Sequence, residues 1–125
     1  MKILAKIIFN LITLCAIGFA IYAYFNPISG RFYFTRSDGL MHLTGFTIVS
    51  CLVVFALPEV KRSNLILWIC SIGGLAEVAQ PLLTRERELS ISDIGANGLG
   101  VLLGVTLASI GIYAVSRLKS RIIAT

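Results

Sequence analysis

Four long apolar stretches constrain this chain more than any other feature of its sequence. They cover about residues 3–25, 38–57, 65–83 and 93–115. Each is long enough to cross the hydrocarbon core of a bilayer, which takes about 20 helical residues. Charged residues make up only 14% of the 125 residues, against roughly 25% in soluble domains. We therefore predict an all-α membrane protein with one domain over residues 1–125, folded as a bundle of four transmembrane helices.

The ends of these stretches carry boundary signals. The first follows Lys2 and ends in aromatic residues, Tyr24 among them, which is typical of a belt at the membrane surface. It is too long for the apolar part of a signal peptide and no small-residue cleavage site follows it, so we expect an uncleaved span. Pro58 is expected to end the second stretch, and Pro81 to kink or end the third.

The Lys and Arg residues divide unequally between the two sides of such a bundle. With four spans both termini share one side, and that side holds seven of the 11 basic residues: Lys2, Lys6, Lys61, Arg62, Arg117, Lys119 and Arg121. The other side holds four: Arg31, Arg36, Arg85 and Arg87. The positive-inside rule then predicts that both termini lie in the cytoplasm, in a multi-pass protein of the inner membrane.

Several functional classes are not indicated. The basic residues form no groove with interleaved aromatic residues, so we expect no nucleic-acid partner. Cys15, Cys51 and Cys70 lie in apolar stretches without paired spacing, so we interpret them as small hydrophobic residues. No phosphate-binding loop or dinucleotide fingerprint is present, and we expect no cofactor.

Polar residues that are unusual for a membrane span gather near one end of the predicted bundle. They form three pairs, each spaced to project from one face of its helix: Asp38 with His42, Glu77 with Gln80, and Asp93 with Asn97. A charge facing lipid at full depth costs about 2.5–3.5 kcal/mol, which favours inward placement. We therefore expect the three pairs and Arg87 to share an outward-facing polar pocket.

The last span also carries small residues at four-residue spacing, a pattern that lets helix backbones approach closely. These residues are Ala96, Gly100, Gly104 and Ala108. We expect the stripe to pack against a neighbouring helix. Ser92 or Asp93 is expected to cap the beginning of this span.

At these positions the chain resembles the VanZ-like family of small bacterial membrane proteins. The motifs that carry the resemblance, in chain order, are Asp38-x-x-x-His42-x-x-x-Phe46, Glu77-x-x-Gln80, Arg87, and Asp93-x-x-x-Asn97-x-x-Gly100 with Gly104. Together they cover roughly residues 36–112. The chain departs from the family pattern at Gly39, where the family often has Lys, and at Ser90 or Ser92, where it often has an acidic residue. The resemblance implies a four-span protein of the cell envelope, and the founding member is associated with resistance to teicoplanin.

The roles of individual residues stay open between structure and chemistry. His42 is the only histidine, and it is either an interhelical hydrogen-bonding residue or a general base beside Asp38. Glu77 is either an ion-pair partner of Arg87 or His42, or a group that contacts a ligand or a proton. Asp93 is a helix cap or a third candidate for catalysis. These acids and the histidine suit a metal ion by type, but no metal-binding spacing is present and we predict no metal site.

Three functions remain open at this stage. We favour a non-enzymatic protein that binds a lipid-linked or cell-wall precursor headgroup, with Arg85 and Arg87 suited to phosphate. The first alternative is an intramembrane enzyme acting on a lipid-linked phosphate or sugar. The second is a structural accessory subunit of an envelope or polysaccharide system. Besides the bilayer, a second copy of the chain or another membrane protein is an expected partner.

Overall fold

The computed structural model describes residues 2–25, 38–83 and 88–123, and these residues form four helices. In chain order these are α1 (Lys2–Phe25), α2 (Asp38–Ala56), α3 (Arg62–Leu83) and α4 (Ile91–Ile123). The predicted all-α fold with four long apolar helices is confirmed, and the first three helices follow the expected bounds within a few residues. The fourth helix continues eight residues beyond the expected end at Val115.

Local sequence explains where the helices begin and end. Pro58 follows α2 and the chain turns there, with the amide of Val60 donating to the carbonyl oxygen of Leu57 at 3.2 Å. Pro81 lies inside the last turn of α3, which ends two residues later. A hydrogen bond of 3.2 Å from the Asp93 amide to the Ser90 hydroxyl caps α4, so Ser90 occupies the capping position that we expected at Ser92 or Asp93.

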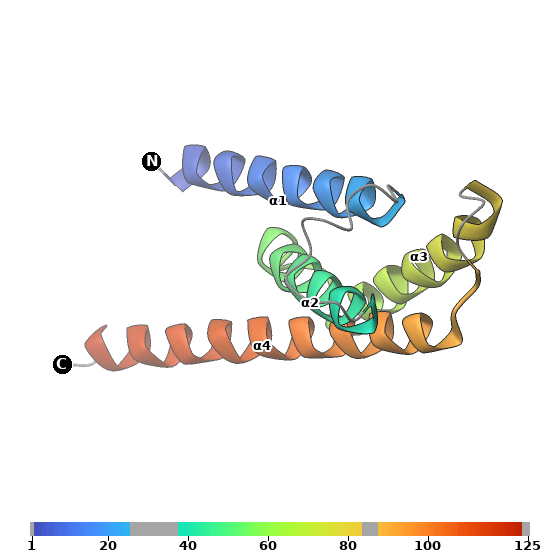
Figure 1. Ribbon diagram of the computed structural model, residues 1–125. Coiled ribbons are helices and arrows are strands. Elements are labelled where there is room, and N and C mark those ends of the chain that lie inside the picture. Colours follow the sequence, from blue (N-terminus) through green and yellow to red (C-terminus); the bar gives the residue numbers. More distant parts are fainter. Residues whose placement is uncertain (1, 26–37, 84–87, 124–125) are drawn as a thin grey trace.

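The four helices are arranged around the contact between α2 and α4, which pack against each other more extensively than any other pair. Helix α1 lies against α2, and α3 lies against both α4 and α2. Figure 1 shows that α1 begins and α4 ends on the same side of the molecule, whereas α1 and α3 end, and α4 begins, on the other side. This second side is where the polar pairs lie.

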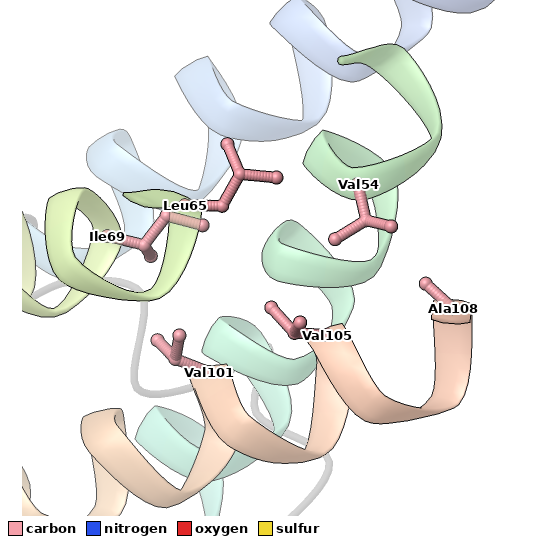
Figure 2. Close-up of a cluster of buried hydrophobic side chains, with 6 residues drawn as sticks. All are labelled: Val54, Leu65, Ile69, Val101, Val105 and Ala108. Carbon is pink, nitrogen blue, oxygen red and sulfur yellow. The ribbon is translucent and has the colours of Figure 1, made fainter. Parts of the chain in front are cut away.

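Two glycines of α4 allow α2 to approach so closely. A Cβ atom on Gly100 would lie 2.5 Å from the Leu43 carbonyl oxygen, and one on Gly104 would lie 2.9 Å from Cβ of Ser50. No side chain larger than hydrogen fits at either position without moving a helix backbone. Next to this helix crossing, α2, α3 and α4 share a small apolar core (Figure 2). It is formed by Val54, Leu65, Ile69, Val101, Val105 and Ala108.

Most other large apolar side chains face outward. Leu14, Phe19, Leu75 and Leu107 are 63%, 69%, 69% and 57% exposed. All four helices are long and apolar enough to cross a membrane, so lipid is the solvent that this surface suits. The chain is therefore a multi-pass membrane protein. Helix α4, with 33 residues, spans about 50 Å at 1.5 Å per residue, and its basic last turns extend beyond the hydrocarbon core.

Candidate functional site

The structure brings the three predicted polar pairs together at one end of the helices. His42 faces α4 and α3 from the second turn of α2, Glu77 and Gln80 face it from α3, and Asn97 lies opposite it on α4. We define the His42 cluster by its seven members: Tyr24, Asp38, His42, Glu77, Gln80, Asp93 and Asn97. All four helices contribute to it.

The two nitrogen atoms of His42 have different surroundings. Its Nδ1 atom lies 3.0 Å from Oδ1 of Asn97 and 3.6 Å from Oε1 of Glu77. Because Oδ1 of an asparagine can only accept, His42 donates the Nδ1 hydrogen to Asn97. The neutral imidazole in this state keeps an unprotonated Nε2 atom.

That Nε2 atom faces two carboxylates. Oδ1 of Asp38 lies 3.8 Å away and Oδ2 of Asp93 lies 3.9 Å away. Both distances exceed the length of a hydrogen bond. The exposed fraction of the side chain decreases from Asp38 to Asp93 to His42, with values of 45%, 12% and 5%. Asp38 is therefore the edge of the cluster that is open to the outside.

Glu77 is the most deeply placed acid. It is completely buried, and one of its carboxylate oxygens, Oε1, accepts a hydrogen bond from the hydroxyl of Tyr24. Within the described residues its other oxygen, Oε2, has no hydrogen-bond partner. Nδ2 of the buried Asn97 makes no hydrogen bond of ordinary geometry, although the Asn97 side chain interacts with the Tyr24 hydroxyl. Buried polar atoms are nearly always hydrogen bonded in folded proteins, so this pair is an exception that calls for an explanation.

Tyr24 is the cluster member that sequence reasoning missed. We predicted it as a residue of the aromatic belt, but its ring lies edge-on to the His42 ring, with centroids 5.1 Å apart and planes at 87°. Its carbonyl oxygen accepts a hydrogen bond of 2.9 Å from Nε2 of Gln80. Gln80 therefore ties the end of α1 to α3. The available signal was a phenol in the last turn of one span and a buried acid in another.

The remaining predicted site residues stand as follows. Arg85 and Arg87 lie outside the described residues. In the packing stripe Gly100, Gly104 and Ala108 are buried against α2 and the core, and Ala96 is half-buried. Asp93 lies in the first turn of α4 and points its carboxylate at His42.

One subset of the cluster has the composition of a metal site. Asp38, His42 and Asp93 each offer one ligand atom, and these three atoms all lie within 4.8 Å of one another. The absence of a metal-binding spacing in the sequence led us to predict no metal. Asp38, His42 and Asp93 come from two helices, so no short motif contains all three.

We compared the chain with known protein families, proteins and structures. No protein-family model, curated protein or solved structure matches the chain. The resemblance to the VanZ-like family therefore depends on the motifs quoted above. The class that the fold and the cluster define is a multi-pass α-helical membrane protein with buried polar side chains at one end of its helices.

Proposed function

We propose that the chain is a VanZ-like protein of the bacterial cytoplasmic membrane that binds the polar headgroup of a lipid-linked envelope precursor at the His42 cluster. Both termini lie in the cytoplasm, as the distribution of Lys and Arg favours. The helix ends that carry the cluster then lie at the outer surface. An outward-facing cluster is placed to meet precursors displayed on that side.

The observation that carries this proposal is the pair of buried polar atoms that make no hydrogen bond of ordinary geometry among the described residues. Oε2 of Glu77 is an acceptor and Nδ2 of Asn97 is a donor. A sugar hydroxyl both donates and accepts, so it suits such a pair. The ligand enters from the edge at Asp38, whose side chain is 45% exposed.

The described part of the cluster is acidic, which suits hydroxyl and amine groups better than phosphate. The phosphate of a lipid-linked sugar needs cationic or amide donors. Arg85 and Arg87 follow α3 in the chain and supply the cationic side chains that the proposal requires. Sugar recognition is thus assigned to Glu77 and Asn97, and phosphate recognition to the arginines.

The proposal is tested by titrating purified protein in lipid nanodiscs with a fluorescent undecaprenyl-pyrophosphate-linked disaccharide. Undecaprenyl phosphate without sugar serves as the reference lipid. We expect saturable binding that Glu77→Gln weakens at least ten-fold, because a hydrogen bond to a buried carboxylate contributes about 1.5–3 kcal/mol and 1.4 kcal/mol is a factor of ten. The matched control is Glu59→Gln, which alters a carboxylate that is 75% exposed near the start of α3.

Equal affinity of the wild-type protein and Glu77→Gln, with both folded, removes the headgroup site from the His42 cluster. Absence of binding to either lipid removes the proposal itself. A structural accessory role predicts a third pattern, in which His42→Ala lowers stability and cellular activity together. A stable but inactive His42→Ala protein contradicts that role.

An intramembrane enzyme acting on a lipid-linked phosphate or sugar is the second candidate. It is favoured by the position of His42, whose Nε2 atom lies 3.8 Å from Asp38 and 3.9 Å from Asp93. In that case His42 acts as the base and Glu77 or Asp93 as the acid. Analysis of the same incubations for released phosphate or sugar decides between binding and turnover.

A further inference from the structure

The open side of the His42 cluster has the donor set and spacing of a metal site. The Nε2 atom of His42 lies 3.8 Å from Oδ1 of Asp38 and 3.9 Å from Oδ2 of Asp93. The ligand atoms that these three residues offer all lie within 4.8 Å of one another. Tetrahedral Zn²⁺ with bonds of about 2.0–2.1 Å holds its ligands roughly 3.3–3.4 Å apart. The two nitrogen–oxygen distances exceed this spacing by about half an ångström, and the two aspartate oxygens, which lie within 4.8 Å of each other, have to approach by at most about 1.4 Å to share one ion.

The imidazole is already oriented as a metal ligand. Its Nδ1 hydrogen is donated to Asn97, which leaves the Nε2 lone pair directed at the two aspartates. Metal-binding histidines almost always donate their other ring hydrogen in this way, because the hydrogen bond selects the tautomer and fixes the ring. The carboxylate of Glu77 lies 3.6 Å from the same Nδ1 atom of His42, on the side of the ring away from the two aspartates. It accepts a hydrogen bond from the Tyr24 hydroxyl.

Both aspartates lie at the beginning of a helix. Asp38 is in the first turn of α2 and Asp93 in the first turn of α4, at the positive ends of the two helix dipoles. Yet the side chain of Asp93 is only 12% exposed, and the nearest histidine nitrogen lies 3.9 Å from its carboxylate, beyond the length of a hydrogen bond. The completely buried Glu77 likewise has an oxygen without a described partner. Buried carboxylates in proteins are paired with cations or coordinate metals.

We propose that Asp38, His42 and Asp93 bind one divalent transition-metal ion, for which Zn²⁺ is the best-suited probe. One imidazole and two carboxylates are ligands that Zn²⁺ accepts. Three protein ligands leave a coordination position open on the side of Asp38, where an oxygen atom of water or of a phosphate can bind. The metal site does not depend on headgroup binding, and it is tested without any precursor lipid.

The test uses the full-length protein, purified in a non-ionic detergent and stripped with EDTA. Equilibrium dialysis against Zn²⁺ followed by elemental analysis measures the stoichiometry and the Kd. We expect one ion per chain, and a Kd at least ten-fold higher in Asp38→Asn and in Asp93→Asn. Both variants keep the size of the side chain, and Asp38 is partly exposed, so loss of folding is not the expected effect. Glu59→Gln is the control and binds as the wild type does.

Replacing Zn²⁺ by Co²⁺ provides a second measurement. Its signal comes from the bound metal ion itself, so residues with a purely structural role do not produce it. Visible absorption bands of bound Co²⁺ are expected in the wild-type protein and are lost in His42→Ala. Absence of Zn²⁺ binding overturns the proposal, and so does binding that neither aspartate variant weakens. Binding that appears only in Arg87→Ala also overturns it, because an arginine then occupies the position assigned to the ion.

Discussion

Replacing Gly100 by alanine tests whether the close contact between α2 and α4 holds the His42 cluster together. The new Cβ atom would lie 2.5 Å from the Leu43 carbonyl oxygen and 2.9 Å from Cβ of Phe46. An ordinary contact begins at 3.4 Å, so the two backbones must separate by roughly 0.9 Å. Gly98 on the same helix provides the matched control, because its Cβ would meet nothing within 4 Å.

The difference between the two variants isolates the packing effect. Alanine in place of glycine favours the helix by about 1 kcal/mol in water, and this gain applies to both positions. Overpacking costs about 1–3 kcal/mol and applies only to Gly100→Ala. We therefore expect Gly100→Ala to be about 1–3 kcal/mol less stable than Gly98→Ala, whatever the helix-propensity term amounts to in a membrane.

Unfolding of the purified variants in mixed micelles, driven by increasing SDS and followed by circular dichroism, measures this difference. Separation of the helices also moves Asn97 and Asp93 away from His42, because Asn97 lies one turn from Gly100 on the same helix. Weaker Zn²⁺ binding is therefore expected in Gly100→Ala but not in Gly98→Ala. Equal stability of the two variants would refute the tight crossing on which the geometry of the cluster depends.

Three further predictions concern the cluster and the topology. Tyr24→Phe removes the donor to buried Glu77 and should lower stability by about 1–3 kcal/mol in the same SDS titration; an unchanged midpoint contradicts the assigned hydrogen bond. Arg87→Ala should weaken binding of the pyrophosphate-linked disaccharide while leaving Zn²⁺ binding unchanged, and equal lipid affinity in the two proteins removes the arginine from the site. Green fluorescent protein fused after Thr125 should fluoresce and alkaline phosphatase fused there should be inactive, whereas the opposite pattern reverses the orientation.

The four helices were predictable because their cause is local. Twenty or so apolar residues in lipid have to satisfy their backbone hydrogen bonds within the segment, and a helix does so. The helix ends depend on weaker signals. Helix α4 continues past Val115 through Arg117 and Lys119 because both are good helix formers that can extend into water. Ser90, rather than Ser92 or Asp93, begins it, since several neighbouring residues can cap a helix and geometry selects one.

The polar pairs and their gathering at one end of the bundle were predictable, but the contacts between the pairs were not. Spacing along a helix determines that Asp93 and Asn97 share a face, since the helical period is a property of the segment alone. It does not determine which face of which helix lies opposite. That was decided by packing: the glycines of α4 let α2 approach and place His42 between Asn97 and Asp93. The three residues of the proposed metal site likewise come from two helices, so no short sequence motif contains them.

The sequence by itself determined that this is a four-helix membrane protein with polar residues at one end of its helices. Hydrophobicity and the helical period are properties of a single segment, so the sequence of that segment is enough to predict its helix and the residues on each face. The tertiary structure alone decided that Tyr24 joins the cluster and that Glu77 is buried against it. These contacts join residues 53 positions apart, and only the approach of separate helices creates them.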